Sequence, residues 1–235
     1  MRVLLVRHGQ SRANVDGSEN RHIADHAIEL SEEGHRQAQT CGAFLDDWFQ
    51  HNLPPVPAPK LRLWHSPYTR TRQTADHVQA ACGAWLHDRK EHLLLAEQQF
   101  GIFDGLSDEE RAARYPDFYA YYEKCKRFEG KLWPKMPLGE SRFEVAQRVH
   151  QAFGSFKRDE DKRGIETIVV VGHGTINRAF VMMWLHLPYE WMHHEPNPAN
   201  CSVRLIEDGE DRGYVFEGFA DPEGQERTGT HETEE

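Results

Sequence analysis

Cysteine is scarce and unpaired in this sequence. The four cysteines among 235 residues lie far apart and form no C-x-x-C pair: Cys41, Cys82, Cys125 and Cys201. This spacing predicts neither a zinc site nor a disulfide framework. We therefore expect reduced, structural cysteines and a cytoplasmic protein.

The chain also lacks a surplus of positive charge and any long apolar run. Its formal net charge is -10, so a general nucleic-acid-binding surface is not expected. The apolar run from Val3 to Val6 is too short for the core of a signal peptide and far too short to span a membrane. Neither nucleic acid nor a membrane is a predicted partner, and an anionic ligand would need a locally basic pocket.

The sequence does contain an alternation of apolar strands and amphipathic helices. Strands are expected at 2–6, 61–66, 92–97, 166–174, 201–208 and 213–220, and helices at 31–49, 66–83, 107–128 with an interruption at Pro116, 139–158 and 175–187. This order predicts an α/β fold, a three-layer α/β/α sandwich with a mostly parallel central sheet. We expect a single domain over 1–220, a stiff proline-rich connector at 52–60 and a flexible acidic tail over 221–235.

Charged or histidine-bearing turns follow four of the expected strands. Arg7 and His8 follow the first, Arg70 comes shortly after the second, Glu97 ends the third and His173 follows the fourth. Taken singly, each of these residues is more often structural or solvated than functional. Because the carboxyl ends of parallel strands meet at one edge of a sheet, the repeated pattern predicts one site there.

The side chains at this predicted site suit phosphoryl transfer. A neutral imidazole is a good nucleophile toward phosphorus, and two guanidinium groups match phosphoryl oxygens with forked donors. A carboxylic acid beside them can protonate the leaving oxygen. A metal centre on His8, His173 and Glu97 is the alternative, but Arg7 and Arg70 would repel a cation placed between them. No P-loop or G-x-G-x-x-G turn is present, so nucleotide triphosphate chemistry is not indicated.

Six motifs resemble those of the histidine phosphatase superfamily, in the branch related to cofactor-dependent phosphoglycerate mutase. In chain order they are VRHGQSRAN, LSEEGHRQA, SPYTRTRQTA, AEQQFGIFDG, GESRFEVAQRV and VVVGHGTINRA, which span about residues 3–180. The resemblance implies a phosphoglycerate mutase-like fold. The DHAIEL stretch is similar to a subgroup of broad-range acid phosphatases.

The resemblance also implies roles for individual residues. His8 would be the phosphorylated nucleophile and Glu97 the proton donor. The phosphate-binding set would be Arg7, His8, Ser11, Asn14, Arg70, His173 and Gly174, with Arg7, Arg70 and His173 also counted as catalytic. One departure concerns the residue before the acid, which is often arginine in the family and is Ala96 here. The resemblance implies no metal and no cofactor.

Substrate choice is expected to depend on the segment 107–138 and on the loop before the first long helix. Arg12, Arg21, Tyr119 and Arg142 are candidates for specificity, with solvated charge or core packing as the competing interpretation for each. Tyr122, Phe128 and Trp133 could line the same pocket or pack in the core. The His193, His194 and Glu195 run has little weight as a metal site, because adjacent residues point in different directions.

Two questions of function stay open at this point. The interval from Glu97 to His173 is short and lacks the insertion of the mutases, which favours a phosphatase over a phosphoglycerate mutase. An inactive binding or scaffold relative is the third possibility, and the intact set of five catalytic residues argues against it. The predicted partner is a small phosphorylated metabolite; the sequence leaves its identity and the oligomeric state open, with a homodimer among the options.

Overall fold

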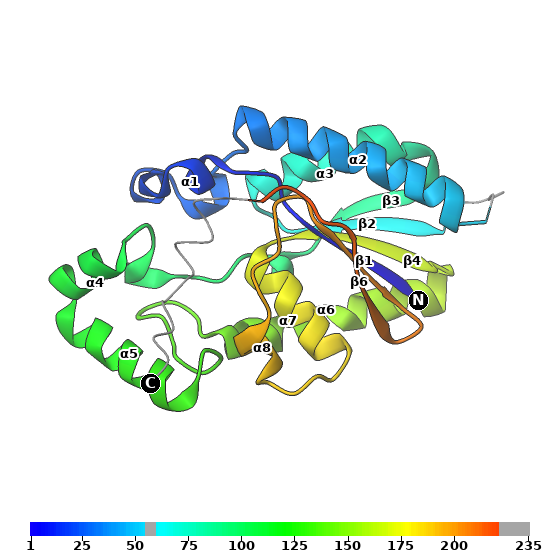
Figure 1. Cartoon of the computed structure of the whole chain (residues 1–235). Coiled ribbons are helices and arrows are strands. Elements are labelled where there is room, and N and C mark those ends of the chain that lie inside the picture. The colour runs from blue at the N-terminus through cyan, green and yellow to red at the C-terminus, as the bar shows by residue number, and fades with distance from the viewer. Residues whose placement is uncertain (55–59, 221–235) are drawn as a thin grey trace.

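The computed structural model describes residues 1–54 and 60–220 and contains a six-stranded sheet with helices on both faces (Figure 1). The strand order is β3-β2-β4-β1-β5-β6. The strands are β1 (Arg2–Arg7), β2 (Leu61–His65), β3 (Leu86–Glu91), β4 (Thr167–Gly172), β5 (Val203–Glu207) and β6 (Glu210–Phe216). The helices are α1 (Arg12–Val15), α2 (Glu32–Asn52), α3 (Thr69–Cys82), α4 (Asp108–Arg114), α5 (Pro116–Glu129), α6 (Arg142–Arg163), α7 (Gly174–Trp184) and α8 (Trp191–His194).

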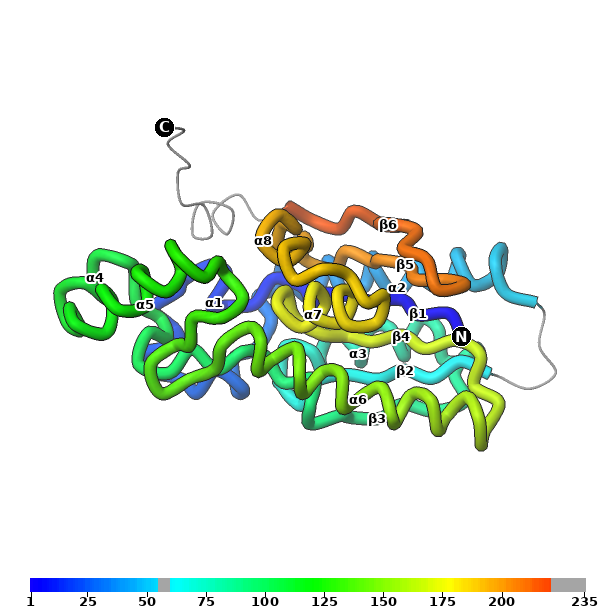
Figure 2. The backbone as a smooth tube through the Cα atoms, turned by 90° about the horizontal axis from the view of Figure 1, so that it is seen from below, coloured from blue at the N-terminus to red at the C-terminus, as the bar shows by residue number. Residues whose placement is uncertain are grey.

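The centre of the sheet is parallel and fully covered. β1 lies beside β4 with Val3 opposite Ile168 and Val6 opposite Val171, and β2 and β3 continue the parallel ladder. β5 and β6 extend the other side in the antiparallel sense. Figures 1 and 2 show α2 and α3 on one face and α6 and α7 on the other. The predicted three-layer α/β sandwich with a mostly parallel sheet is confirmed.

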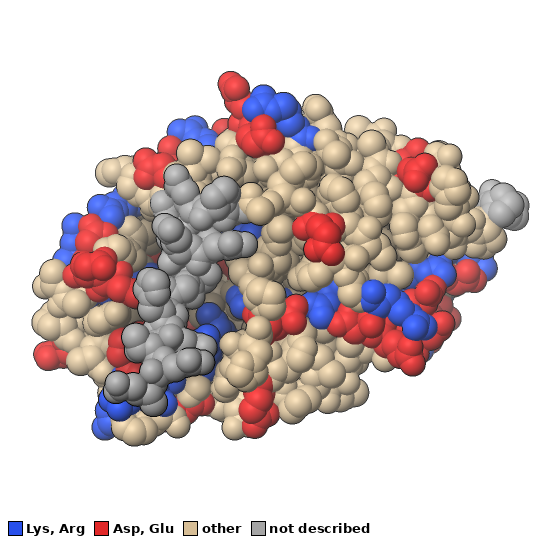
Figure 3. Space-filling model, in the orientation of Figure 1, with Lys and Arg blue, Asp and Glu red and all other residues tan. Residues whose placement is uncertain are grey.

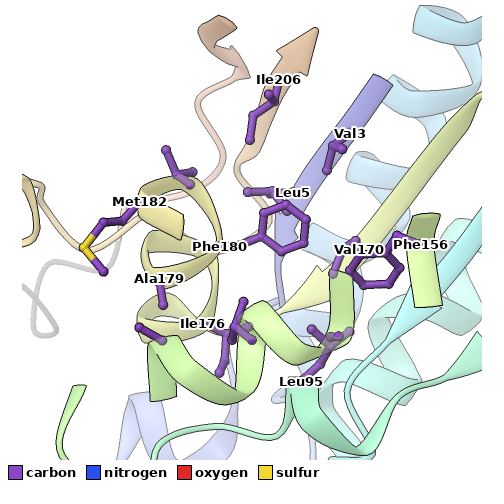
Figure 4. Packing of buried hydrophobic residues seen from close by; sticks show 14 of the residues in the cluster. Val3, Leu5, Leu95, Phe156, Val170, Ile176, Ala179, Phe180, Met182 and Ile206 are labelled. Atoms are coloured by element: carbon purple, nitrogen blue, oxygen red, sulfur yellow. The ribbon is translucent and has the colours of Figure 1, made fainter. Parts of the chain in front are cut away.

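Alternate residues of the central strands enter two different cores. Val3 and Leu5 of β1 face α6 and α7, whereas Leu4 and Val6 face α2 and α3. Figure 4 shows Leu5 and Val170 packed against Phe180 of α7 on the first face. Strands buried on both faces read as continuous apolar runs, which is why β1 and β4 are visible in the sequence.

Serine residues begin several helices where the sequence places them. The hydroxyl of Ser31 accepts a hydrogen bond from the Gly34 amide at the start of α2, and Ser141 forms a capping box with Glu144 at the start of α6. The expected interruption at Pro116 is also confirmed, since α4 ends at Arg114 and α5 begins with the proline. Proline fits the first turn of a helix, where its missing amide is not needed.

The strand expected at 92–97 is wrong. The third strand is β3, and Leu93–Leu95 form a short 3-10 helix instead. β3 is an edge strand with the charged sequence LHDRKE, so it has no apolar run to reveal it. Glu97 therefore lies in a loop beyond the strand and not at its end.

Helices α4 and α5 form a lobe beside the carboxyl ends of the parallel strands (Figure 1). Neither helix contains a buried residue. Among the described residues, no helix is long and apolar enough to cross a membrane. The expected acidic tail at 221–235 and most of the expected connector at 52–60 lie outside the described residues.

Candidate active site

His8 lies directly after β1 and is held on both sides by backbone. Its amide donates to the carbonyl of Gly172 in β4, and its own carbonyl accepts from the side-chain amide of Asn200. The ring Nδ1 lies 2.7 Å from the Gly9 carbonyl oxygen, so Nδ1 carries the proton and donates it. The Nε2 lone pair is then the group directed away from the backbone.

The charge state of His8 follows from its surroundings. The side chain is buried, and burial together with the nearby Arg70 and Arg7 guanidinium groups holds its pKa well below the usual value. The imidazole is therefore neutral at neutral pH. A neutral imidazole with a free Nε2 lone pair is the nucleophilic form.

Two glycines allow the turn after His8 to approach α2 closely. A Cβ atom on Gly9 would lie 2.5 Å from the Gly34 carbonyl oxygen, and one on Gly34 would lie 1.9 Å from that of Gln10. Backbone atoms cannot move out of the way at such distances. The two glycines belong to separate sequence motifs, and the fold explains why both are needed.

His173 is completely buried and faces His8. The centroids of the two rings lie 5.2 Å apart with an interplanar angle of 65°. Nε2 of His173 lies 2.8 Å from the Ser66 hydroxyl, and Nδ1 lies 3.9 Å from Oε2 of Glu97. Burial and the Arg70 charge keep the pKa of His173 well below its usual value. His173 is thus a neutral group between the predicted nucleophile and the predicted acid.

Each predicted phosphate-binding arginine is fixed by the loops around it. Nη1 of Arg7 donates to the carbonyl of Pro198 at 2.6 Å. Nη1 of Arg70 donates to the backbone and side chain of Asp25 at 2.7 and 2.8 Å, and its guanidinium lies 4.8 Å from the Tyr68 ring centroid. Both side chains are buried, so their charges act strongly on a bound anion.

Glu97 is a buried carboxyl group whose acid form is favoured. Burial raises its pKa, and the Gln98 amide and Arg70 oppose this rise only in part. Its Oε1 accepts the Gln98 amide at 2.8 Å. A carboxyl group with a raised pKa can donate a proton near neutral pH, as a general acid must.

The loop that carries Glu97 is held by Arg148 of α6. The Arg148 guanidinium donates to the carbonyl oxygens of Leu94, Ala96 and Glu97, and it pairs with Glu140. The position before the acid is Ala96 and supplies no side-chain donor. Arg148 therefore supports the acid's loop from another element, and the sequence carries no local signal for this contact.

Ser11 and Asn14, predicted to bind phosphate, are bonded to each other. The Asn14 side-chain oxygen accepts from the Ser11 amide and hydroxyl, and the Ser11 hydroxyl accepts from the Asn14 amide. This capping box begins α1. It uses the oxygen of the Asn14 amide group, so the phosphate role predicted for Asn14 would fall to its NH2 group. Gly174, the last predicted member, begins α7, where a Cβ would lie 2.0 Å from the Asn197 side-chain oxygen.

The specificity candidates separate into different environments. Arg12 pairs with Glu19 at the surface, and Arg21 pairs with Glu110 of α4. The Tyr119 ring packs against Phe103. Phe103 also packs against Tyr122, whereas Phe128 and Trp133 are exposed and Glu195 pairs with Arg204. Arg142 differs from the other arginines and is considered below.

Three side chains that shape the site are not among the predicted site residues. Ser66 contacts His173, Asp25 pairs with Arg70, and Tyr68 lies between Arg70 and His173 with its ring centroid 5.0 Å from that of His173. Ser66 and Tyr68 stand beside Arg70 in the SPYTR segment, so their proximity could have suggested a role. Asp25 comes from a loop far away in sequence, and only the fold brings it to Arg70.

Comparison with known proteins gives consistent results. Residues 3–221 match the family model described as histidine phosphatase superfamily (branch 1). The chain is 30% identical over 221 residues to the phosphoglycerate mutase-like protein AT74 of Arabidopsis thaliana, covering 91% of this chain and 66% of that protein. It is 28% identical over 187 residues to an acid phosphatase of Mycobacterium tuberculosis, covering 80% of this chain and 77% of the other.

A solved structure of a related protein is similar to this chain in fold as well as in sequence. The mycobacterial glucosyl-3-phosphoglycerate phosphatase, solved with VO3, is 25% identical, with a TM-score of 0.65 over 93% of this chain and 98% of that one. The family match covers nearly all of the described residues, including every segment that contributes to the site. The chain therefore belongs to the histidine phosphatase superfamily, branch 1.

Proposed function

We propose that this protein is a metal-independent phosphomonoesterase that hydrolyses small phosphorylated metabolites through a phosphohistidine on His8. One observation carries the proposal. A neutral, buried His8 lies beside two fixed arginines, and His173 separates it from Glu97, a carboxyl group whose pKa is raised. The two pKa shifts therefore favour a deprotonated nucleophile and a protonated acid, which are the forms that the reaction needs. The acid phosphatases among the relatives support the same reaction class.

In the first step, Nε2 of His8 attacks phosphorus and the ester P–O bond breaks. The electron pair of that bond stays on the leaving oxygen, which takes the proton of Glu97. Arg7 and Arg70 bind the phosphoryl oxygens, and His173 donates a hydrogen bond to one of them as charge develops. The product of this step is the alcohol and a phosphoryl group on His8.

In the second step, the Glu97 carboxylate takes a proton from water while the water oxygen attacks phosphorus. The P–N bond breaks, and its electron pair returns to Nε2 of His8. Inorganic phosphate leaves, and Glu97 is protonated again. No cofactor and no metal enters this cycle.

The test is hydrolysis of p-nitrophenyl phosphate with and without EDTA. We expect turnover that EDTA leaves intact, together with an acid-labile phosphoenzyme trapped by rapid quenching. Absence of turnover from acid to neutral pH would instead favour a binding or scaffold role. Loss of turnover in EDTA would overturn the metal-free mechanism.

Phosphoglycerate mutase activity is the second candidate, since relatives carry the name phosphoglycerate mutase-like. Both reactions share the first step and differ in whether water or a sugar acid accepts the phosphoryl group. The segment between Glu97 and His173, whose length favours a phosphatase, contains the helices α4, α5 and α6. Neither α4 nor α5 contains a buried residue. Incubation with 3-phosphoglycerate and 2,3-bisphosphoglycerate decides the matter. Formation of 2-phosphoglycerate without free phosphate would establish the mutase.

A further inference from the structure

Two arginines near the proposed site, Arg142 and Arg178, form no ion pair with a carboxylate of the residues that the structure describes. The described part of the chain contains many arginine–carboxylate pairs, but neither of these two takes part in one. We propose that Arg142 and Arg178 form a second anion site beside the phosphate pocket, and that the preferred substrate carries a second acidic group, a carboxylate or a phosphate, near its ester phosphate. This inference rests on the proposed phosphatase function and names its substrate class.

Arg178 is held against the first turn of α7, next to His173. Its side chain is buried and reaches back along the helix, with Nε 3.3 Å from the Gly174 carbonyl oxygen. Nη1 lies 3.3 Å from the backbone oxygen of Glu195. The Glu195 carboxylate pairs with Arg204 instead, so Arg178 has only neutral carbonyl groups as partners.

Arg142 is the first residue of α6, which lies on the same face of the sheet as α7. No hydrogen bond or ion pair of its side chain is found among the described residues, although the side chain is partly buried. Arg148, six residues later in the same helix, pairs with Glu140 and with three carbonyl groups. The contrast within one helix shows that acidic partners are available nearby and that Arg142 does not use them.

The two guanidinium groups lie close enough to influence each other and Glu97. Burial and the Arg142 charge together lower the pKa of Arg178 to about 10, while Glu97 opposes the change. Burial also lowers the pKa of Arg142, with Tyr122 and Glu97 acting in the opposite direction. Two buried like charges without counter-ions are costly, and a bound anion would remove that cost.

A single phosphate group does not account for this surplus of charge. Arg7 and Arg70 already supply two guanidinium groups for a phosphate dianion, and Arg70 is partly neutralised by Asp25. Arg142 and Arg178 come from α6 and α7, on the side of the site opposite to α3, which carries Arg70. Figure 3 shows the surface hollowed between the α4–α5 lobe and the rest of the molecule, with basic side chains visible at the hollow.

The experiment compares substrates that differ only in the second group. Glycerol 3-phosphate and 3-phosphoglycerate have the same ester, but the second carries a carboxylate in place of an alcohol. Fructose 6-phosphate and fructose 1,6-bisphosphate form the matched pair for a second phosphate. We expect kcat/KM for phosphate release to be about 10-fold to 100-fold higher for the more acidic member of one pair, the size of one or two charge-assisted hydrogen bonds.

The variant Arg142→Gln tests whether this preference comes from the proposed residues. We expect the preference ratio to fall toward one in Arg142→Gln, and in Arg178→Gln if that buried variant folds. The control is Arg36→Gln, whose exposed guanidinium pairs with Glu33 far from the site; it should keep the wild-type ratio. A wild-type ratio near one for both pairs, or a ratio that Arg142→Gln leaves intact, would overturn the inference.

Binding to the His8→Ala protein separates this inference from the proposed function. Calorimetric titration with the same four compounds measures the preference without turnover. If wild-type protein fails to hydrolyse p-nitrophenyl phosphate, the phosphatase function fails, and the binding preference still decides whether the second anion site exists. If hydrolysis occurs and neither binding nor kcat/KM shows a preference, only the second anion site is rejected.

Discussion

The carboxyl edge of β1 and β4 and the α4–α5 lobe face the same site but are built in opposite ways. From Val3 to Arg7 every residue of β1 is buried, as is every residue of β4, whereas α4 and α5 contain no buried residue. His8 and His173 follow the buried strands directly. The lobe is joined to the segment after α1 by the ion pair of Arg21 with Glu110, and Asn20 bonds to Asp104 in the loop that leads into the lobe.

This difference assigns separate tasks to the two regions. A reacting imidazole must be placed to within a fraction of an ångström, and strands packed on both faces provide that precision. A lobe with an exposed surface and polar contacts can vary in sequence without disturbing the sheet. We therefore expect changes at the sheet edge to affect the reaction itself and changes in the lobe to affect the choice of substrate.

The largest effect is expected for His8→Ala. Removing the nucleophile should lower kcat for p-nitrophenyl phosphate by about 10⁴-fold or more and abolish the trapped phosphoenzyme. The matched control is His77→Gln, which removes another partly buried imidazole, one that contacts His35 on the outer helices. A His8→Ala protein that still forms a phosphoenzyme would contradict the assignment of the nucleophile.

A smaller and substrate-dependent effect is expected for Glu97→Gln. Proton donation matters most for poor leaving groups, so glycerol 3-phosphate should lose about 10²-fold to 10⁴-fold in kcat/KM, and p-nitrophenyl phosphate much less. Equal losses in kcat/KM for both esters would argue against Glu97 as the acid. The comparison uses initial rates well below saturation, because hydrolysis of the phosphohistidine is common to both esters and affects kcat.

The pH dependence of the wild-type enzyme should reflect both perturbed groups. His8 must be neutral, and because its pKa is lowered, activity should persist below the ordinary imidazole value of about 6.5 and fall only as pH drops through the lowered pKa. Glu97 must be protonated, and because its pKa is raised, activity should fall as pH rises through a value above the ordinary carboxyl range. Glu97→Gln should remove the alkaline decline, and a decline that survives would assign it to another group.

An intermediate effect is expected for Ser66→Ala, which removes the hydroxyl beside Nε2 of His173. If Ser66 acts only by orienting His173, kcat should fall by about 10-fold, the value of one buried hydrogen bond, with KM little changed. Ser66→Thr keeps a hydroxyl and should restore part of the rate. A change confined to KM would indicate that Ser66 binds substrate directly.

The smallest effect is expected in the lobe, for Arg21→Gln and Glu110→Gln. Because solvent screens their partly exposed ion pair, we expect little change in the free energy of unfolding. If Arg21 acts through Glu110, the two single variants and the double variant should alter the substrate profile alike. A rise in KM for Arg21→Gln alone would return Arg21 to the role of a substrate ligand.

The elements predicted best from the sequence are those whose burial requires a recognisable pattern of apolar residues. β1 and β4 appear as continuous apolar runs, and the two Ser-capped helices and the break at Pro116 follow from local chemistry. β3 was missed because its sequence, LHDRKE, is charged and contains no apolar run. The loop position of Glu97 is the direct consequence of that error.

The residues around the site likewise divide into those that local sequence patterns predict and those that they do not. Arg7, His8 and His173 follow predicted strands, so their convergence could be anticipated from parallel topology. Asp25 and Arg148 lie in the DHAIEL and GESRFEVAQRV stretches, but they act through contacts between segments far apart in sequence, which those stretches do not predict.

By itself, the sequence determined the fold class and the family and supplied the candidates for the reacting groups, because these depend on residue types and on local periodicity. Only the tertiary structure decided the directions in which the pKa values of His8 and Glu97 shift, the support of the Glu97 loop by Arg148, and the lack of an ion pair between Arg142 or Arg178 and any described carboxylate. The physical reason is that burial and electrostatic interaction depend on distances between side chains. Those distances exist only after the helices have packed on the sheet.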